Sequence, residues 1–112
     1  MQLTASQVKY LLAIAELSQT RALVSSSNIA DKLKVTRPSV NKMLGVLSNK
    51  GLLEKKRYGA IRLTDFGAQF ASECTERVTK LSIRLADTLC LAHDDLKRCS
   101  ILLVSELPDL AL

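Results

Sequence analysis

The sequence predicts a mainly α-helical fold, a winged helix-turn-helix of three helices plus a β-hairpin wing, followed by a long helix and a C-terminal dimerisation helix. Three observations predict it. Residues 26–53 read as two short amphipathic helices joined by a tight turn, and a basic hairpin follows over residues 53–64. Apolar residues then recur at steps of three and four over about six helical turns. We therefore divide the chain into a winged helix-turn-helix domain, residues 1–64, and a helical dimerisation region, residues 65–112.

The first helix is expected over residues 3–18. Thr4 or Ser6 can cap it, and Thr4 and Gln7 have the spacing of a capping box. Its apolar residues cover a wide face, which indicates that the helix packs on two sides.

The two-helix unit over residues 26–53 carries the strongest pattern. Ser26 or Ser27 is expected to cap its first helix, and Thr36 its second. Lys34 stands at the turn position where glycine is most frequent, so it either adopts a left-handed backbone or the turn is of another type. Val35 is expected to fill the turn with an apolar side chain. An ordinary helical hairpin would satisfy the same spacing, but the charge and the following hairpin favour a unit that binds DNA.

The charge of the chain is segregated. The formal net charge is +5, and residues 28–64 hold nine Lys and Arg against two acidic residues, whereas the remainder holds seven basic and nine acidic residues. A basic block beside a nearly neutral remainder is typical of a module that binds a polyanion. The block lacks the aromatic platforms of single-strand RNA modules and the basic amphipathic helix of membrane-surface proteins, so we predict double-stranded DNA as the partner.

The predicted DNA contacts follow from position. Residues at the start of the second helix of the unit would lie nearest base edges, and basic residues of the hairpin would reach phosphates or the minor groove. Taken alone, the hairpin also reads as a solvated element with charged edges. The predicted DNA-binding residues are Thr36, Arg37, Pro38, Ser39, Asn41, Lys42, Lys55, Lys56, Arg57 and Arg62.

The C-terminal region predicts a homodimer. Thr64 is expected to cap the long helix, and Asp94 or Asp95 a last helix that ends near Ser105. Residues 101–104 make that helix apolar on nearly all sides, which one protomer hardly buries, and a symmetric dimer is the economical answer. The alternative is a helix folded back on its own core. The predicted dimerisation residues are Leu85, Leu89, Ile101, Leu102, Leu103 and Val104.

The cysteines and the hydropathy favour a cytoplasmic protein. Cys74, Cys90 and Cys99 form no CxxC pair and fall on apolar stripes, so we expect buried, reduced thiols. We find no signal peptide and no apolar run long enough to span a membrane, and we predict no membrane association.

The residues from 6 to 91 resemble the amino-terminal half of the diphtheria-toxin-repressor (DtxR) family of iron- and manganese-dependent repressors. The resemblance implies a winged helix followed by a helical dimerisation region. It is specific through the wing and looser after Cys74. The residues that carry it are Tyr10, Ser27-Asn28-Ile29-Ala30, Val35-Thr36-Arg37-Pro38-Ser39-Val40, Leu47, Lys50-Gly51-Leu52, Arg57-Tyr58-Gly59, Leu63-Thr64 and Gly67.

The metal chemistry of that family does not carry over. The resemblance implies Mn or Fe, which need oxygen and nitrogen donors, at six positions of this chain. None of the six holds a carboxylate or a histidine, and the lysine among them would repel a cation. These positions are Lys9, Leu12, Thr79, Ile101, Val104 and Ser105. We therefore predict no cofactor and no metal site, with Cys90, His93 and Asp94 as the one alternative cluster, close together in sequence.

The leading functional hypothesis is a repressor-like transcriptional regulator that binds a pseudo-palindromic operator as a dimer without activation by Mn or Fe. No pattern in the sequence indicates catalysis, so we predict that the protein is not an enzyme. Two alternatives remain. One is a MarR-type repressor that responds to a small molecule bound in an apolar pocket between the long helix and the winged domain. The other is a winged-helix protein-interaction module that does not target DNA. The operator, the regulated genes, the sign of regulation and the signal do not follow from the sequence.

Overall fold

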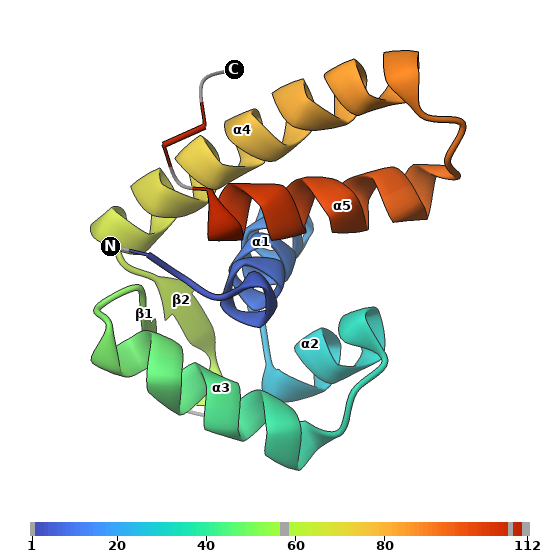
Figure 1. Cartoon of the computed structure of the whole chain (residues 1–112). Helices are drawn as coiled ribbons and strands as arrows, with labels where there is room; N and C mark the ends of the chain where they lie inside the picture. Colours follow the sequence, from blue (N-terminus) through green and yellow to red (C-terminus); the bar gives the residue numbers. More distant parts are fainter. Residues whose placement is uncertain (1, 57–58, 108, 111–112) are drawn as a thin grey trace.

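The structure is a computed structural model that describes residues 2–56, 59–107 and 109–110, with principal extents of 46 × 26 × 23 Å. These residues form helices and one two-stranded antiparallel sheet, in the order that the sequence predicts (Figure 1). The elements are α1 (Ala5–Thr20), α2 (Ser26–Leu33), α3 (Arg37–Asn49), β1 (Leu53–Lys55), β2 (Ile61–Leu63), α4 (Asp65–Thr88) and α5 (His93–Glu106).

Helix α1 is the centre of the core. In Figure 1 it passes behind α5, with α4 on one side and α2 and α3 on the other. Its wide apolar face explains this position, because Leu11 and Ile14 are completely buried and the helix contacts four other helices. One continuous hydrophobic cluster joins residues of the winged part, such as Ile29, to residues of α4 and α5, such as Val78 and Val104.

The N-terminal caps explain where the first two helices begin. Thr4 and Gln7 form the predicted capping box of α1, which runs two residues later than expected at both ends. The expectation that Ser26 or Ser27 caps α2 is wrong. Ser25 is the cap, because its backbone is extended and its hydroxyl accepts the backbone N–H of Asn28 at 3.2 Å. The Asn28 side chain accepts the Ser25 N–H in return.

The turn between α2 and α3 is left-handed at Lys34, whose φ is 57° and ψ 46°. One of the two alternatives for this lysine is thereby confirmed. Val35 is 37% exposed, so the expectation that its side chain fills the turn is wrong. Its backbone N–H instead donates to the carbonyl of Ala30 at 3.1 Å. Ile29 on α2 and Val40 on α3 are both completely buried in the same hydrophobic cluster, where α2 packs on α3.

The wing is a short hairpin in which Leu53 pairs with Leu63 and Lys55 with Ile61. Each strand has three residues, within the hairpin predicted over residues 53–64, and Arg57 lies outside the described residues. Ile61 also donates its backbone N–H to Val24 at 2.8 Å, which attaches the hairpin to the connector after α1. The base of the wing is therefore fixed to the core on two sides.

Helix α4 begins where β2 ends. Thr64 is its N-cap as predicted, accepting the backbone N–H of Gly67 at 2.9 Å, and its hydroxyl donates to the carbonyl of Gly51 at 2.6 Å. Gly51 has the positive φ expected of the residue after a helix end, 78°. Gly67 lies against the backbone of Leu52 with no room for a side chain. This contact sets the position of α4 relative to the winged part.

Helix α5 packs along α4. A serine pair ties the two, because the Ser100 hydroxyl donates to Leu96 O at 2.7 Å and lies 2.8 Å from the Ser82 hydroxyl. Asp94 and Asp95 do not cap α5 as expected. The N-cap is Ala92, and both carboxylates lie within the first turn, where they favourably oppose the helix dipole.

Burial in the C-terminal region corrects two expectations. Ile101 is 7% and Val104 6% exposed, so one protomer does bury these two residues, against its own core. Cys74 is buried as expected, but Cys90 is exposed and Cys99 is only half-buried. Across the described residues, the helices include none that is long and apolar enough to cross a membrane.

Candidate DNA-binding interface

The start of α3 presents polar and basic side chains to solvent. Thr36 is the N-cap as predicted, and its hydroxyl accepts the Ser39 N–H at 3.3 Å and donates to the Ser39 hydroxyl at 2.8 Å. Arg37 and Pro38 occupy the first turn, and both are exposed. Proline suits this turn because its missing N–H would have no partner within the helix. The four residues from Thr36 to Ser39 therefore form a capped, solvent-facing helix end.

The outward face of α3 continues this surface. Asn41 and Lys42 are exposed, whereas Val40, Leu44 and Leu47 on the opposite face are completely buried. The Ser26 hydroxyl donates to Asn41 Oδ1 at 2.9 Å, which joins the start of α2 to the outer face of α3. Sequence reasoning missed Ser26 as a positioning residue because its partner lies fifteen residues away on another helix.

The wing adds cations beside this face. Lys55, Lys56 and Arg62 are exposed. Lys56 is paired with Glu54 at 3.2 Å, and Glu54 also lies directly across from Arg62 in the hairpin. One cation of the wing is therefore already paired within the hairpin, and the unpaired ones among the described residues are Lys55 and Arg62.

The arrangement in space brings these elements to one end of the molecule. In Figure 1, α3 lies at the edge farthest from α4 and α5, with the hairpin and α2 beside it. An exposed helix flanked by a basic hairpin has the geometry by which winged helices place a helix in the major groove and a wing on the backbone. Each predicted DNA-binding residue that the structure describes is exposed at this end.

The residues at the metal positions implied by the resemblance do not fit Mn or Fe. Leu12, Ile101 and Val104 are buried apolar side chains, and Lys9 is an exposed cation. The Ser105 hydroxyl is engaged with the carbonyl of Leu102 at 2.9 Å. Hard divalent cations need several carboxylate or carbonyl oxygens. The described residues also contain no group of three or more His, Cys, Asp or Glu that could hold an ion, and that includes Cys90, His93 and Asp94.

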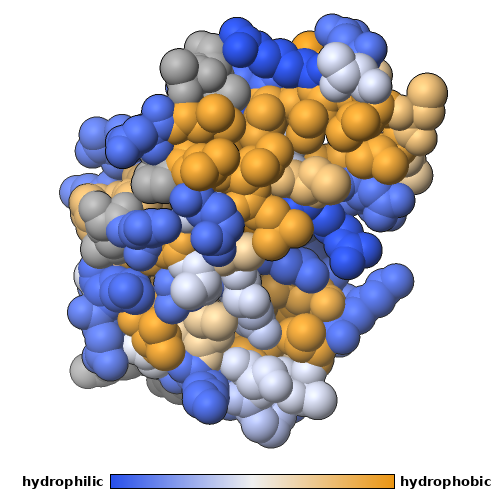
Figure 2. All heavy atoms as spheres, in the orientation of Figure 1, coloured by the Kyte–Doolittle hydropathy of each residue, from blue (hydrophilic) through white to orange (hydrophobic). Residues whose placement is uncertain are grey.

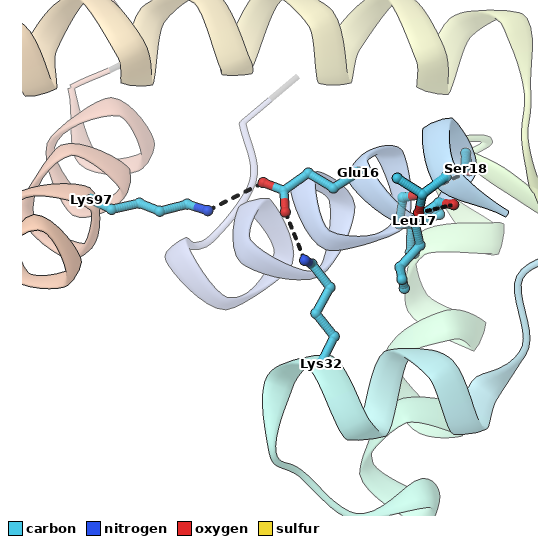
Figure 3. A network of polar contacts seen from close by, with 7 residues as sticks. Glu16, Leu17, Ser18, Lys32 and Lys97 are labelled. Carbon is cyan, nitrogen blue, oxygen red and sulfur yellow. Dashed lines mark hydrogen bonds and ion pairs between the residues drawn. The ribbon is translucent and has the colours of Figure 1, made fainter.

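An ion-pair network joins three helices on a face that sequence reasoning did not single out. Figure 3 shows Glu16 of α1 between Lys32 of α2 and Lys97 of α5, at 2.9 Å and 3.2 Å. Burial raises the pKa of the Glu16 carboxyl, but hydrogen bonds from the two ammonium groups outweigh it, so the net pKa lies below the ordinary value. No local pattern could have revealed this network, because its members lie far apart in the sequence.

The fold and this surface define a winged-helix protein of the DNA-binding class. The chain belongs to the iron-dependent repressor family, because residues 2–61 match the family model described as the N-terminal DNA-binding domain of the iron-dependent repressor. No curated protein matches the chain in sequence.

Solved structures share the fold. T. acidophilum IdeR superposes with a TM-score of 0.70 at 23% identity, over 86% of this chain and 45% of its own. The manganese regulator SloR gives 0.71 at 25%, over 89% and 47%. A hypothetical protein from Sulfolobus solfataricus gives 0.67 at 22%, over 94% and 79%. The chain thus spans about half the length of the first two.

Proposed function

We propose that the protein is a repressor-like transcriptional regulator, not an enzyme, that reads duplex DNA with the start of α3 and holds the backbone with its wing. The observation that carries the proposal is the exposed end of α3, where Arg37, Asn41 and Lys42 face solvent beside the cations of the hairpin. Arginine at such a position can donate two hydrogen bonds to a guanine edge in the major groove. Membership of the iron-dependent repressor family supports the same reading.

We further propose that the protein binds a pseudo-palindromic operator as a homodimer held by its C-terminal helices. Of the eight exposed large hydrophobic residues among those described, five lie on α4, α5 or their connector. Figure 2 shows apolar side chains gathered over α5. Because Ile101 and Val104 are buried within the protomer, the proposed surface is carried by Leu102 and Leu89, with the half-buried Leu85 and Leu103 beside them. Such an interface would give a dimer with two-fold symmetry, which matches the two-fold symmetry of a pseudo-palindromic operator.

The proposed regulator works without Mn or Fe. Support comes from the positions where the resemblance implies metal ligands. Buried leucine, isoleucine and valine side chains stand there in place of the oxygen and nitrogen ligands that such ions need. We expect the affinity for operator DNA to be the same in chelator and in added manganese or ferrous iron, at fixed salt. A tenfold gain with either metal, about 1.4 kcal/mol, would contradict the expectation and would direct mutation to Cys90, His93 and Asp94.

The direct test of the DNA-binding surface begins with selection of bound sequences from random duplexes. The selected duplex and a scrambled one are then titrated with wild type, Arg37→Ala and Lys80→Ala, the last being a lysine on α4 away from the interface. Arg37→Ala should lose about 1–3 kcal/mol on the selected duplex and much less on the scrambled one. Lys80→Ala should match wild type. Equal losses of Arg37→Ala on both duplexes would assign Arg37 to phosphate rather than to bases, and the absence of any selected sequence would favour the protein-interaction alternative.

A further inference from the structure

A groove of about 680 Å³ lies between α1, α2 and α5, outside the proposed DNA-binding surface. Its floor is apolar and includes Leu12, Leu33 and Ile101. Its size falls in the range of pockets that hold small molecules, roughly 300–1,000 Å³. The groove adjoins the Glu16 network, which Figure 3 shows bridging the same three helices.

The rim of the groove is strongly basic. It carries five cations against two carboxylates, and the charged residues are Lys9, Lys32, Lys34, Lys97, Arg98, Glu16 and Asp94. Glu16 is shared by two of the lysines, and Arg98 lies 3.8 Å from Asp95. Lys9 and Lys34 have no carboxylate within ion-pair distance among the described residues. Two lysines that line the groove are therefore without a carboxylate partner among the described residues.

The apolar floor and the cationic rim together indicate which kind of small molecule would fit the groove. A neutral apolar molecule would leave the rim unused, and a bare inorganic anion would leave the floor exposed to water. The rim would also repel a metal cation. We propose that this groove is a binding site for a small molecule that carries a carboxylate or phosphate on an apolar body. Lys9 and Lys34 hold the anion, and the leucine and isoleucine side chains cover the body.

A molecule bound in the groove would contact both the winged part of the protein and its last helix. Lys32 and Lys34 belong to α2 and to the turn that leads into α3, whereas Lys97 belongs to α5. The groove shares Leu102 with the proposed dimer surface, but its lining includes none of the proposed DNA-binding residues, so the site is testable without DNA.

The experiment is an amide chemical-shift titration of the full chain without DNA. The probe is 2-naphthoate, with the neutral isostere 2-naphthamide as its matched control. Wild type is compared with Lys9→Gln, Lys34→Gln and Lys80→Gln, the last on α4 and outside the groove. Thermal melting of each variant tests whether the substitution affects folding.

We expect 2-naphthoate to shift amides on α1, the turn after α2, and α5, and to bind more tightly than 2-naphthamide. Lys9→Gln and Lys34→Gln should each weaken its binding about threefold, the size of an exposed charge pair, while Lys80→Gln leaves it unchanged. Equal binding of acid and amide, equal binding by all variants, shifts that map elsewhere, or no saturable binding would each overturn the proposal.

Discussion

Gly67 sets how closely α4 approaches the turn that ends α3. A methyl group built on its Cα would overlap the carbonyl of Leu52. The colliding atoms are backbone atoms, so they cannot move aside by a rotamer change. We predict that Gly67→Ala lowers the free energy of unfolding by about 1–3 kcal/mol, measured by urea denaturation.

Gly45 is the matched control for this substitution. It too lies within a helix, α3, but a methyl group there meets nothing within 4 Å. Gly45→Ala should therefore raise the free energy of unfolding by about 0.5–1 kcal/mol, because alanine is the better helix former. Equal stability of the two variants would contradict the claim that α4 packs at Gly67 directly against the backbone of Leu52.

At the scale of single residues, some features could be predicted from the sequence and others could not. The sequence predicts the caps Thr36 and Thr64 correctly because capping positions have local signals. For Lys34 the sequence allows two alternatives, because lysine carries no signal for a positive φ, and only the packing of α2 on α3 decides between them. Val35 was misplaced because the pattern of apolar residues does not say which side chain a turn exposes.

At the scale of elements, Glu16 links α1 to both α2 and α5. Its pKa is lowered in the folded protein, so its ionised form stabilises the fold at pH values above the pKa of this carboxyl in the unfolded chain. That stabilisation is lost as the pH falls through the lower folded pKa. We predict that Glu16→Gln is less stable than wild type at neutral pH, by about 1 kcal/mol or less per exposed ion pair. The difference should vanish in acid.

Denaturant unfolding from neutral pH to pH 2 measures this difference. Glu73→Gln on α4 serves as the control, because the described residues offer Glu73 no ion pair. Its stability should track that of wild type at every pH. A Glu16→Gln deficit that persists unchanged in acid would mean that packing, rather than charge, accounts for it.

The elements themselves were largely predictable, and their relations were not. The order of helices and hairpin follows from periodicity and caps, and the helix ends were placed within about two residues. The groove between α1, α2 and α5 could not be anticipated. It arises from where the last helix packs against the first, and the spacing of Lys9, Lys34 and Lys97 along the chain carries no sign of it.

At the scale of the whole molecule, the apolar surface of α5 predicts a dimer. Leu102 is 52% exposed, so an aspartate there costs the isolated protomer little. In an interface the same carboxylate would be buried without a partner, which is costly. We predict that wild type is dimeric at micromolar concentration in sedimentation experiments, and that Leu102→Asp is monomeric.

Leu23 provides the control for this change, because it is 72% exposed but lies in the connector after α1. Leu23→Asp should remain dimeric. A monomeric wild type, or a Leu102→Asp variant that stays dimeric, would contradict the proposal of a C-terminal dimer interface.

The central claim, that one end of the molecule reads duplex DNA, is tested most directly by mapping amide chemical shifts when the selected duplex is added to the labelled protein. We predict that the largest shifts fall on residues 36–42 at the start of α3 and on residues 54–62 of the wing, and that they weaken at high salt because the wing contacts phosphates. Shifts confined to α4 and α5, or no shifts at saturating duplex, would contradict the claim.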